Sequence, residues 1–227
     1  MPGKNTRDLA GKPLICWAIE EAKKSKLLTR IIVSTDSEEI ADVAKSCGAE
    51  APFLRPAEIS QDLSTDVEFL AHALDYLKEK EGYEPDIVLR LPPTSPLRTA
   101  AHIDKGIRTL IENPEADSCR PITESPKHPY KMWRVNDGLA TMEPFLPKTV
   151  TQMDEPYNLP RQMLPKAYIH TGAMDVMRLR TIRDLKSTSG KKVTYFFMKP
   201  EDSINIDSEI DFESAEILMR KRLNRPI

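Results

Sequence analysis

The chain has 227 residues, 30% of them charged and 6% aromatic, and this length suffices for one domain with a sizeable core. Its 33 Lys and Arg residues nearly balance its 35 Asp and Glu residues, so the formal net charge is −2. This balance disfavours binding to nucleic acid or to an anionic membrane, and every apolar run is far shorter than the roughly 20 residues of a membrane-spanning helix. The first residues lack the apolar stretch of a secretory signal, so the sequence predicts a cytosolic protein.

The cysteines and glycines narrow the class further. Cys16, Cys47 and Cys119 are few and far apart, which favours reduced buried thiols over a disulfide framework or a metal site of the C-x-x-C type. The sequence contains neither G-x-G-x-x-G nor G-x-x-x-x-G-K-[ST], the glycine motifs that mark ordinary dinucleotide-binding folds and P-loop folds. These two fold classes are therefore disfavoured.

Hydrophobic periodicity predicts two helices around one strand in the first 50 residues. Residues 13–25 have apolar positions at helical spacing. Residues 30–36 form a short β-branched run that predicts a buried parallel strand. Asp36 and Glu39 then form a capping pattern for a second helix, which Gly48 is expected to end.

The alternation of helix and strand continues to residue 121. Thr65 and Glu68 begin a predicted amphipathic helix that ends near Gly82. A strand over 86–91, a helix over 100–112 and a short strand over 116–121 follow. This order predicts an α/β fold of the Rossmann-like type, with a mostly parallel sheet and helices on both faces.

The alternation of predicted helices and strands is absent between residues 123 and 165 and resumes after them. Forty irregular residues are unusual within a compact domain, so we interpret 123–165 as a functional excursion ordered by a second subunit, which predicts a homodimer. Two strands over 168–177 and 193–198 and a last helix over 208–223 complete a single domain spanning 1–227.

Polar groups at the carboxyl ends of the strands are the candidate site residues, because open α/β sheets bind ligands there. Lys4 and Asn5 precede the first helix and suit a triphosphate, although a solvated terminal lysine is the simpler interpretation. Thr94 and Ser95 lie in a proline-stiffened loop after the strand over 86–91. That loop is equally explained as a structural turn with a helix cap.

Two further segments carry candidate ligands. Asn205 and Asp207 could hold Mg²⁺ through side-chain oxygens, while Ser208 and Asp211 nearby fit helix capping. Arg161, next to Gln162, could bind a substrate carboxylate with both guanidinium nitrogens, or it could be an ordinary surface arginine.

Several motifs occur together and in order along nearly the whole chain, and as a set they are far more specific than any one of them. On these motifs the sequence resembles the acylneuraminate cytidylyltransferases, the CMP-sialic acid synthetases and related CMP-nonulosonic acid synthetases. The matching segments are PGKN at 2–5, GKPLI at 11–15, IVSTDSEEIA at 32–41, PFLRP at 52–56, PTSPLR at 93–98, LPRQ at 159–162, GA at 172–173, and ID at 206–207 with Glu209 and DFE at 211–213.

The resemblance implies a nucleotide-diphospho-sugar transferase type of fold and transfer of CMP from CTP to the anomeric hydroxyl of a nonulosonic acid. It also implies a Mg²⁺ cofactor, loss of pyrophosphate and a dimer in which 123–165 contributes to the interface. By position it assigns Lys4, Asn5 and Arg55 to the nucleotide, and Lys4 and Asp207 to catalysis. Thr94, Ser95, Arg161 and Gln162 would bind substrate, and Asp207 with Asn205 would bind the metal.

The chain departs from the family pattern in ways that leave a second hypothesis open. The family has a first strand and a glycine-rich loop ahead of the PGKN segment, and Pro92, Thr171 and Asn205 replace the usual Gln, Asn and Asp. We therefore expect an upstream strand and loop to raise both activity and stability. The alternative function is that of a truncated or impaired homologue that only binds nucleotide or sugar acid.

Overall fold

A computed structural model describes residues 3–136, 138–224 and 226 and divides the chain into two compact units. The first unit contains the chain up to Ile122 and from His170 onward, and the second contains Thr123–Ile169. Pro2 of the N-terminal motif lies outside the described residues.

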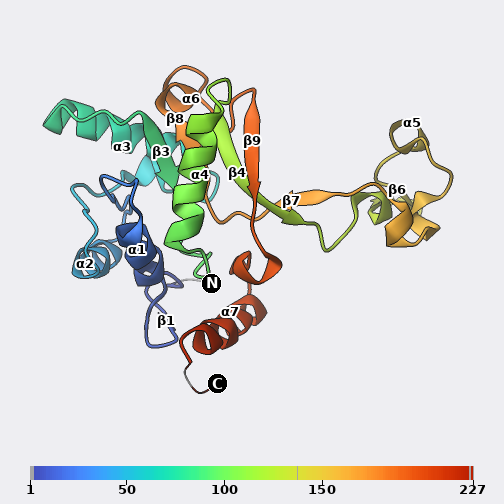
Figure 1. Cartoon of the computed structure of the whole chain (residues 1–227), viewed down its shortest axis with the longest axis horizontal. Coiled ribbons are helices and arrows are strands. Elements are labelled where there is room, and N and C mark those ends of the chain that lie inside the picture. Colours follow the sequence, from blue (N-terminus) through green and yellow to red (C-terminus); the bar gives the residue numbers. More distant parts are fainter. Residues whose placement is uncertain (1–2, 137, 225, 227) are drawn as a thin grey trace. The chain divides into compact units, whose positions relative to one another are not determined.

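In the described part of the first unit, helices follow one another over 14–81, and strands and helices alternate over 87–122 and over 175–222, while the second unit contains a hairpin and short helical turns (Figure 1). The helices are α1 (Leu14–Lys24), α2 (Glu38–Ser46), α3 (Asp66–Glu81), α4 (Ala100–Glu112), α5 (Lys148–Thr151), α6 (Leu179–Arg183) and α7 (Glu209–Arg222). The strands are β1 (Asp8–Leu9), β2 (Lys12–Pro13), β3 (Ile87–Arg90), β4 (Ser118–Glu124), β5 (Trp133–Asn136), β6 (Thr141–Pro144), β7 (Tyr168–His170), β8 (Asp175–Arg178) and β9 (Val193–Phe197).

The central sheet is mixed, so the prediction of a mostly parallel sheet is wrong. Its strand order is β3-β8-β4-β7, and β9 also pairs with β4. Strand β8 lies antiparallel to both β3 and β4, whereas β4 and β9 are parallel. The run over 168–177, expected to be one strand, divides at Gly172, whose φ of 70° turns the backbone between β7 and β8.

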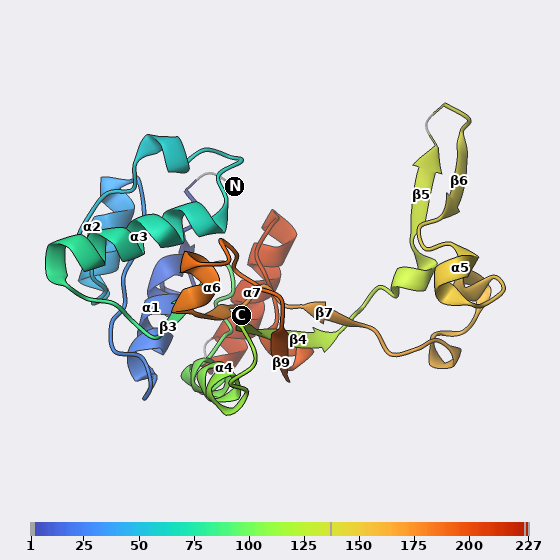
Figure 2. The ribbon, with the colours of Figure 1, turned by 90° about the horizontal axis from the view of Figure 1, so that it is seen from above.

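Helices cover both faces of this sheet, as predicted (Figure 2). Two neighbouring residues of β8 pack on opposite faces of the sheet. Val176 packs in a cluster with Ile103 and Ile107 of α4. The next residue, Met177, points to the opposite face and packs with Leu70 and other side chains of α3 and α6.

Among the described residues, the β-branched run over 30–36 is extended but forms an isolated bridge instead of the predicted buried strand. That bridge is parallel and joins Ile32 to Glu50. Val33 N–H donates to Glu50 O at 2.8 Å, and Glu50 N–H donates to Ile31 O at 2.8 Å. The opposite side of the run faces a cavity instead of a second strand.

Helix ends confirm one capping prediction and correct another. Helix α3 begins at Thr65, whose N–H donates to Glu68 Oε2 at 2.5 Å, and ends at Gly82 with φ of 64°. The N-cap of α2 is Ser37, whose hydroxyl accepts from Ile40 N–H at 3.3 Å, and not Asp36. Ser37 therefore caps helix α2 in place of Asp36, the residue before it.

The structure joins Cys16 and Cys47 in a disulfide, so the expectation of three reduced thiols is wrong for this pair. Cys16 lies on α1 in a core cluster with Ala44 of α2, and Cys47 is the C-cap of α2. Packing of α1 against α2 brings their Cα atoms to 5.6 Å across 31 residues of sequence. Cys119 remains a buried free thiol, and burial raises its pKa to about 12.

A buried carboxylate, Asp117, holds the loop before β9. Its Oδ2 accepts from the N–H groups of Lys191 and Lys192 at 2.8 and 3.0 Å, and these bonds lower the Asp117 pKa. A Cβ at Gly190 would lie 2.3 Å from Asp117 Cβ, and Gly190 has φ of 71°, so this turn requires glycine.

Replacing Asp117 with asparagine is expected to destabilise the fold at pH 7, because an amide loses the charge-assisted bonds. Because the pKa of Asp117 is lower in the folded state, its ionised carboxylate stabilises the fold at pH values above the ordinary aspartate pKa of about 3.9. This stabilisation is lost as the pH falls through the folded-state pKa. The difference in unfolding free energy between parent and Asp117→Asn should therefore shrink below about pH 4 in denaturant titrations. Glu115→Gln, at an exposed neighbour, is the control; a pH-independent difference would contradict the assignment.

The second unit contains an antiparallel hairpin of β5 and β6. Trp133 of this hairpin packs on Tyr157, with ring centroids 4.6 Å apart. The region expected to be irregular thus has local order of its own. Across the described part of the chain, no helix has the length and apolarity to span a membrane.

Candidate active site

A cavity of about 1090 Å³ in the first unit collects most of the predicted site residues at one end. Thr94 reaches it from the loop after β3, and Asp36 from the end of the extended run over 30–36. The segment after β9 contributes Asn205 and Asp207. These positions follow the carboxyl ends of their extended segments, where an α/β fold places its ligands. The predicted residues that line the cavity are Lys4, Asn5, Arg55, Thr94, Asn205 and Asp207.

Thr94, Asn205 and Asp207 form one hydrogen-bonded chain. Thr94 Oγ1 donates to Asn205 Oδ1 at 2.7 Å, and Asn205 Nδ2 donates to Asp207 Oδ2 at 2.8 Å. The backbones are joined as well, since Ile206 N–H donates to Thr94 O at 2.9 Å. Residues 111 positions apart are thereby fixed beside each other.

Lys4 joins this group from the N-terminal loop. Its ammonium donates to Ile206 O at 3.2 Å, between positions 205 and 207, where the sequence predicts the metal ligands. Arg7 also ties the loop to α7 by two bonds to Glu209, of 2.8 and 2.7 Å. The ammonium group of Lys4 therefore lies against the backbone between Asn205 and Asp207.

Arg55 and Asp36 line another part of the cavity. Arg55 Nε donates to Ser60 Oγ at 2.9 Å, and its Nη2 lies 3.6 Å from Asp36 Oδ1. The guanidinium carbon is 5.5 Å from the centre of the Phe69 ring. These contacts hold the planar cation of Arg55 at the cavity wall.

Ser95 and Arg98 belong to the same loop as Thr94 but are buried beneath it. Ser95 is 1% exposed and does not line the cavity, and its hydroxyl has no hydrogen-bond partner in the described part of the chain. Arg98 is equally buried and donates to Pro92 O at 3.2 Å and to Ala173 O. Burial lowers the Arg98 pKa to about 10. Arg98 thus fixes the loop that presents Thr94.

Arg161 and Gln162 belong to the second unit, where both are exposed. Arg161 Nη2 donates to Glu124 Oε1 at 2.9 Å and to Ser125 O. The structure therefore groups six predicted residues in one cavity and describes these two within a different unit.

The capping interpretation of 208–211 is confirmed. Asp211 Oδ2 accepts from Ser208 N–H and Oγ at 2.8 and 2.7 Å and from Asp207 N–H at 3.2 Å. The Ser208 bonds are the main cause of the lowered Asp211 pKa. Asp211 thus braces the backbone of Asp207 at the start of α7.

Sequence reasoning missed Arg90, which lines the cavity at the end of β3. Its Nη1 lies 3.2 Å from Asp175 Oδ2, and Arg120 Nε lies 2.8 Å from Asp175 Oδ1. Asp175 is 3% exposed, so this charge is buried between two guanidinium groups. No local motif could have revealed the group, because its members come from three separate strands.

The side chains of Asn205 and Asp207 suit a Mg²⁺ ion that is held mainly by water and by the phosphates of a bound substrate. The described residues include no group of three or more His, Cys, Asp or Glu side chains placed to hold a metal ion. Mg²⁺ is commonly bound by one or two carboxylates, with water and substrate phosphates completing the shell. The single carboxylate of Asp207 meets that minimum, whereas Asn205 Oδ1 already accepts from Thr94.

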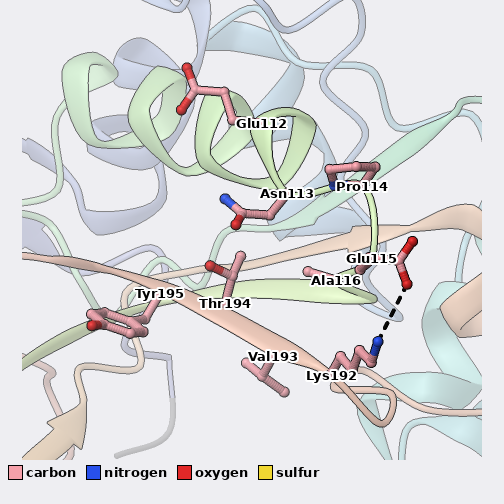
Figure 3. A pocket seen from close by; sticks show the side chains of 9 residues that line it. All are labelled: Glu112, Asn113, Pro114, Glu115, Ala116, Lys192, Val193, Thr194 and Tyr195. Atoms are coloured by element: carbon pink, nitrogen blue, oxygen red, sulfur yellow. Dashed lines mark hydrogen bonds and ion pairs between the residues drawn. The ribbon is translucent and has the colours of Figure 1, made fainter.

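A second depression, of about 320 Å³, lies at the amino ends of β4 and β9 (Figure 3). Its charged contact is an ion pair of 3.3 Å between Lys192 and Glu115, and Tyr195 and Val193 lie along β9. No predicted site residue lines it. The cavity bearing Lys4 and Asp207 is therefore the candidate active site.

Comparison with known proteins shows the class of protein, that of the nucleotidyltransferases, and its family. The cytidylyltransferase family matches residues 1–218. The chain therefore belongs to the cytidylyltransferase family.

Curated relatives agree. The chain is 33% identical to the CMP-N,N'-diacetyllegionaminic acid synthase of Legionella pneumophila, over 96% of this chain and 90% of that protein. It is 29% identical to the N-acylneuraminate cytidylyltransferase of Escherichia coli, over 99% of this chain and 50% of the relative, so it spans about half of that protein. It is 29% identical to the post-translational flagellin modification protein B of Campylobacter coli, over 96% and 89%.

Solved structures support the fold. CMP:2-keto-3-deoxy-manno-octonic acid synthetase in complex with CTP superimposes with a TM-score of 0.69 at 15% identity, covering 98% of this chain and 93% of that one. The 4-diphosphocytidyl-2C-methyl-D-erythritol synthase of Anaerococcus prevotii gives 0.60 at 11% identity, covering 95% and 93%. Both likenesses concern the fold alone.

Proposed function

We propose that the protein transfers CMP from CTP to the anomeric hydroxyl of a nonulosonic acid and releases pyrophosphate. The observation that carries this proposal is the grouping of Lys4, Thr94 and Asp207 at one end of a large cavity, in a chain of the cytidylyltransferase family. The names of the Legionella and Escherichia coli relatives support a nine-carbon sugar acid as acceptor.

In the proposed mechanism the chain binds and orients the two substrates. Lys4, a cation beside Ile206 O, would offset negative charge on the triphosphate, and Arg55 and Asn5 would bind the nucleotide. Asp207 would hold Mg²⁺, which when bound neutralises charge that builds up on the phosphates during transfer. Asn205 and Thr94 would keep Asp207 in place through their hydrogen-bond chain.

Arg161 is the proposed partner of the acceptor's carboxylate. Its guanidinium already binds the carboxylate of Glu124, so its geometry suits such a group. Gln162, exposed beside it, would donate to sugar hydroxyls. Ser95 is buried beneath the cavity and would affect substrate binding indirectly, by supporting the loop that presents Thr94.

The test is nucleotide selectivity combined with acceptor dependence. CTP with Mg²⁺ should raise the melting temperature more than ATP, GTP or UTP does, since ligands that bind the folded state stabilise it. Pyrophosphate release should require CTP together with a nonulosonic acid from a panel of sialic, legionaminic and pseudaminic acids. Equal stabilisation by all four nucleotides, with no acceptor-dependent release, would contradict the proposal.

We also propose a homodimer formed through the second unit. Across the β5–β6 hairpin, Val135 pairs with Met142 and both are more than 60% exposed, so one face is apolar. The other face carries the ion pair of Arg134 with Glu143, at 3.4 Å. Exposed apolar patches of this kind mark interaction surfaces.

Sedimentation should therefore show a dimer at micromolar concentration. Val135→Asp should shift the protein toward monomer, because it places a charge in the apolar face. Thr141→Asp, on the polar face of the same hairpin, should leave the dimer unchanged. A monomeric parent protein would refute the interface.

A further inference from the structure

The Cys16–Cys47 disulfide joins two helices that both contribute to the wall of the candidate active site. Cys16 lies in the first turn of α1, next to Ile15, which lines the cavity. Cys47 ends α2, the helix from which Ile40 lines the same cavity. Around the bond, side chains of both helices pack in one apolar cluster. A change at this bond can therefore reach the cavity through either helix.

On one side of the bond, the first turn of α1 holds the N-terminal loop. The N–H of Ile15 donates to Asn5 O at 2.9 Å, and the N–H of Leu14 donates to Arg7 O at 2.9 Å. Asn5 and Lys4 of this loop line the cavity and are the residues proposed to bind the nucleotide. A movement of the first turn of α1 would therefore move the loop that carries them.

On the other side, the bond is connected to the wall that carries Arg55. Glu50 follows Cys47 by three residues, and its carbonyl accepts from Val33 N–H at 2.8 Å. In the same extended run, Thr35 O accepts from Arg55 N–H at 2.7 Å. The disulfide thus fixes the spacing between two sets of residues that would bind one nucleotide.

The surroundings of the bond suit exchange with an external thiol. Cys16 is 2% exposed, whereas Cys47 is only partly buried, so Cys47 is the accessible end of the bond. The Lys23 ammonium donates to Cys47 O at 3.3 Å, and Ser46 Oγ lies 3.8 Å from Cys47 Sγ. A neighbouring cation and hydroxyl favour the thiolate, the form in which a cysteine leaves a disulfide.

We propose that the Cys16–Cys47 bond is a site of reversible thiol–disulfide exchange with a dithiol, and that its reduction loosens the attachment of the N-terminal loop to α1. Because that loop carries Lys4 and Asn5, reduction would also weaken nucleotide binding, a consequence that rests on the proposed function. The bond would then make the activity depend on the supply of reduced dithiol.

The exchange proceeds in two balanced steps. A thiolate of the reductant bonds to Cys47 Sγ, and the electron pair of the broken bond goes to Cys16 Sγ, which takes a proton. The second thiolate of the reductant then attacks the reductant sulfur of this mixed disulfide, and Cys47 leaves as a thiolate and is protonated. The reductant becomes a cyclic disulfide, and the protein gains two electrons and two protons. Cys16 remains in an apolar cluster, where a free thiol packs as a small hydrophobic group.

Titration with mixtures of reduced and oxidised dithiothreitol tests the exchange without any nucleotide. The bond should be half reduced while the circular dichroism spectrum is still that of the folded protein, and oxidised dithiothreitol should restore it. In the reduced protein, the amides of Leu14 and Ile15 should exchange hydrogen roughly tenfold faster or more, because their local opening requires less free energy. The amide of Leu179, which donates to Asp86 O at 3.0 Å, should keep its rate.

Binding of CTP with Mg²⁺ tests the consequence for the site. Reduction should raise the dissociation constant of CTP about fivefold or more, the lower end of the usual coupling between two sites. Coupling of this kind is reciprocal, so saturating CTP should lower the equilibrium constant for reduction by dithiothreitol by the same factor.

Two variants are the controls. Cys47→Ser removes the bond at its less buried end, should bind CTP as the reduced protein does, and should not respond to dithiothreitol. Cys119→Ala removes the thiol outside the bond and should respond as the parent does. If Cys47→Ser fails to fold, the reduced parent protein decides.

Three results would overturn the proposal. The bond could be reduced only in the unfolded protein, or the exchange rates of Leu14 and Ile15 could be equal in the oxidised and reduced proteins. The third is a dissociation constant of CTP that is the same in both states. Absence of CTP binding in both states would instead refute the cytidylyltransferase proposal, and the exchange rates of Leu14 and Ile15 would then decide the present one.

Discussion

Asp207→Asn is expected to lower Mg²⁺-dependent pyrophosphate release by on the order of 10²-fold, the size of the loss when one preorganised electrostatic group is removed from an active site. Asp207 is exposed, and the bond that its side chain receives from Asn205 Nδ2 can also be accepted by an amide oxygen. The fold should therefore persist. The rate should recover partly at higher Mg²⁺ concentration if the loss is one of metal affinity.

Glu201→Gln is the matched control, since it removes one negative charge six residues before Asp207. Glu201 lies on the surface 3.9 Å from Lys199, with 59% of its side chain exposed, and does not line the cavity. Turnover should stay within a few-fold of the parent. Equal losses in both variants would indicate a general charge effect and would argue against a metal at Asp207.

Local sequence patterns predicted those parts of the fold that depend on local interactions. Helices α1, α3, α4 and α7 form within a residue or two of their expected bounds, because spacing and caps such as Thr65 and Gly82 act within one turn. The direction of strands depends on distant partners. The antiparallel insertion of β8 between β3 and β4 therefore had no signal in its own residues.

The candidate site was predictable to the extent that it follows strand ends. Thr94 and Asp207 each follow an extended segment, and the α/β rule brings such positions together. The hydrogen bond of Thr94 to Asn205 and the burial of Ser95 depend on how the loop over 92–98 folds on Arg98. Arg161 belongs to the second unit, whereas the cavity lies in the first, so sequence order alone could not relate Arg161 to the cavity.

The disulfide was missed for the same reason, because two cysteines 31 residues apart carry no sign of the helix packing that joins them. Closing a loop of this length stabilises a fold by roughly 3–4 kcal/mol in the chain-entropy model. For a chain of this size that energy corresponds to a melting temperature roughly 10 °C higher.

Reduction of the Cys16–Cys47 bond is therefore expected to lower the melting temperature by about 10 °C in calorimetry with and without a thiol reductant. Cys47→Ser should show the same loss, and reductant should then have no further effect, which separates loss of the bond from other actions of the reagent. Cys119 should contribute nothing, since burial keeps its thiol protonated and shielded. Alkylation of the unfolded, unreduced protein should label one cysteine; labelling of three, with a melting temperature insensitive to reductant, would show that the bond does not form.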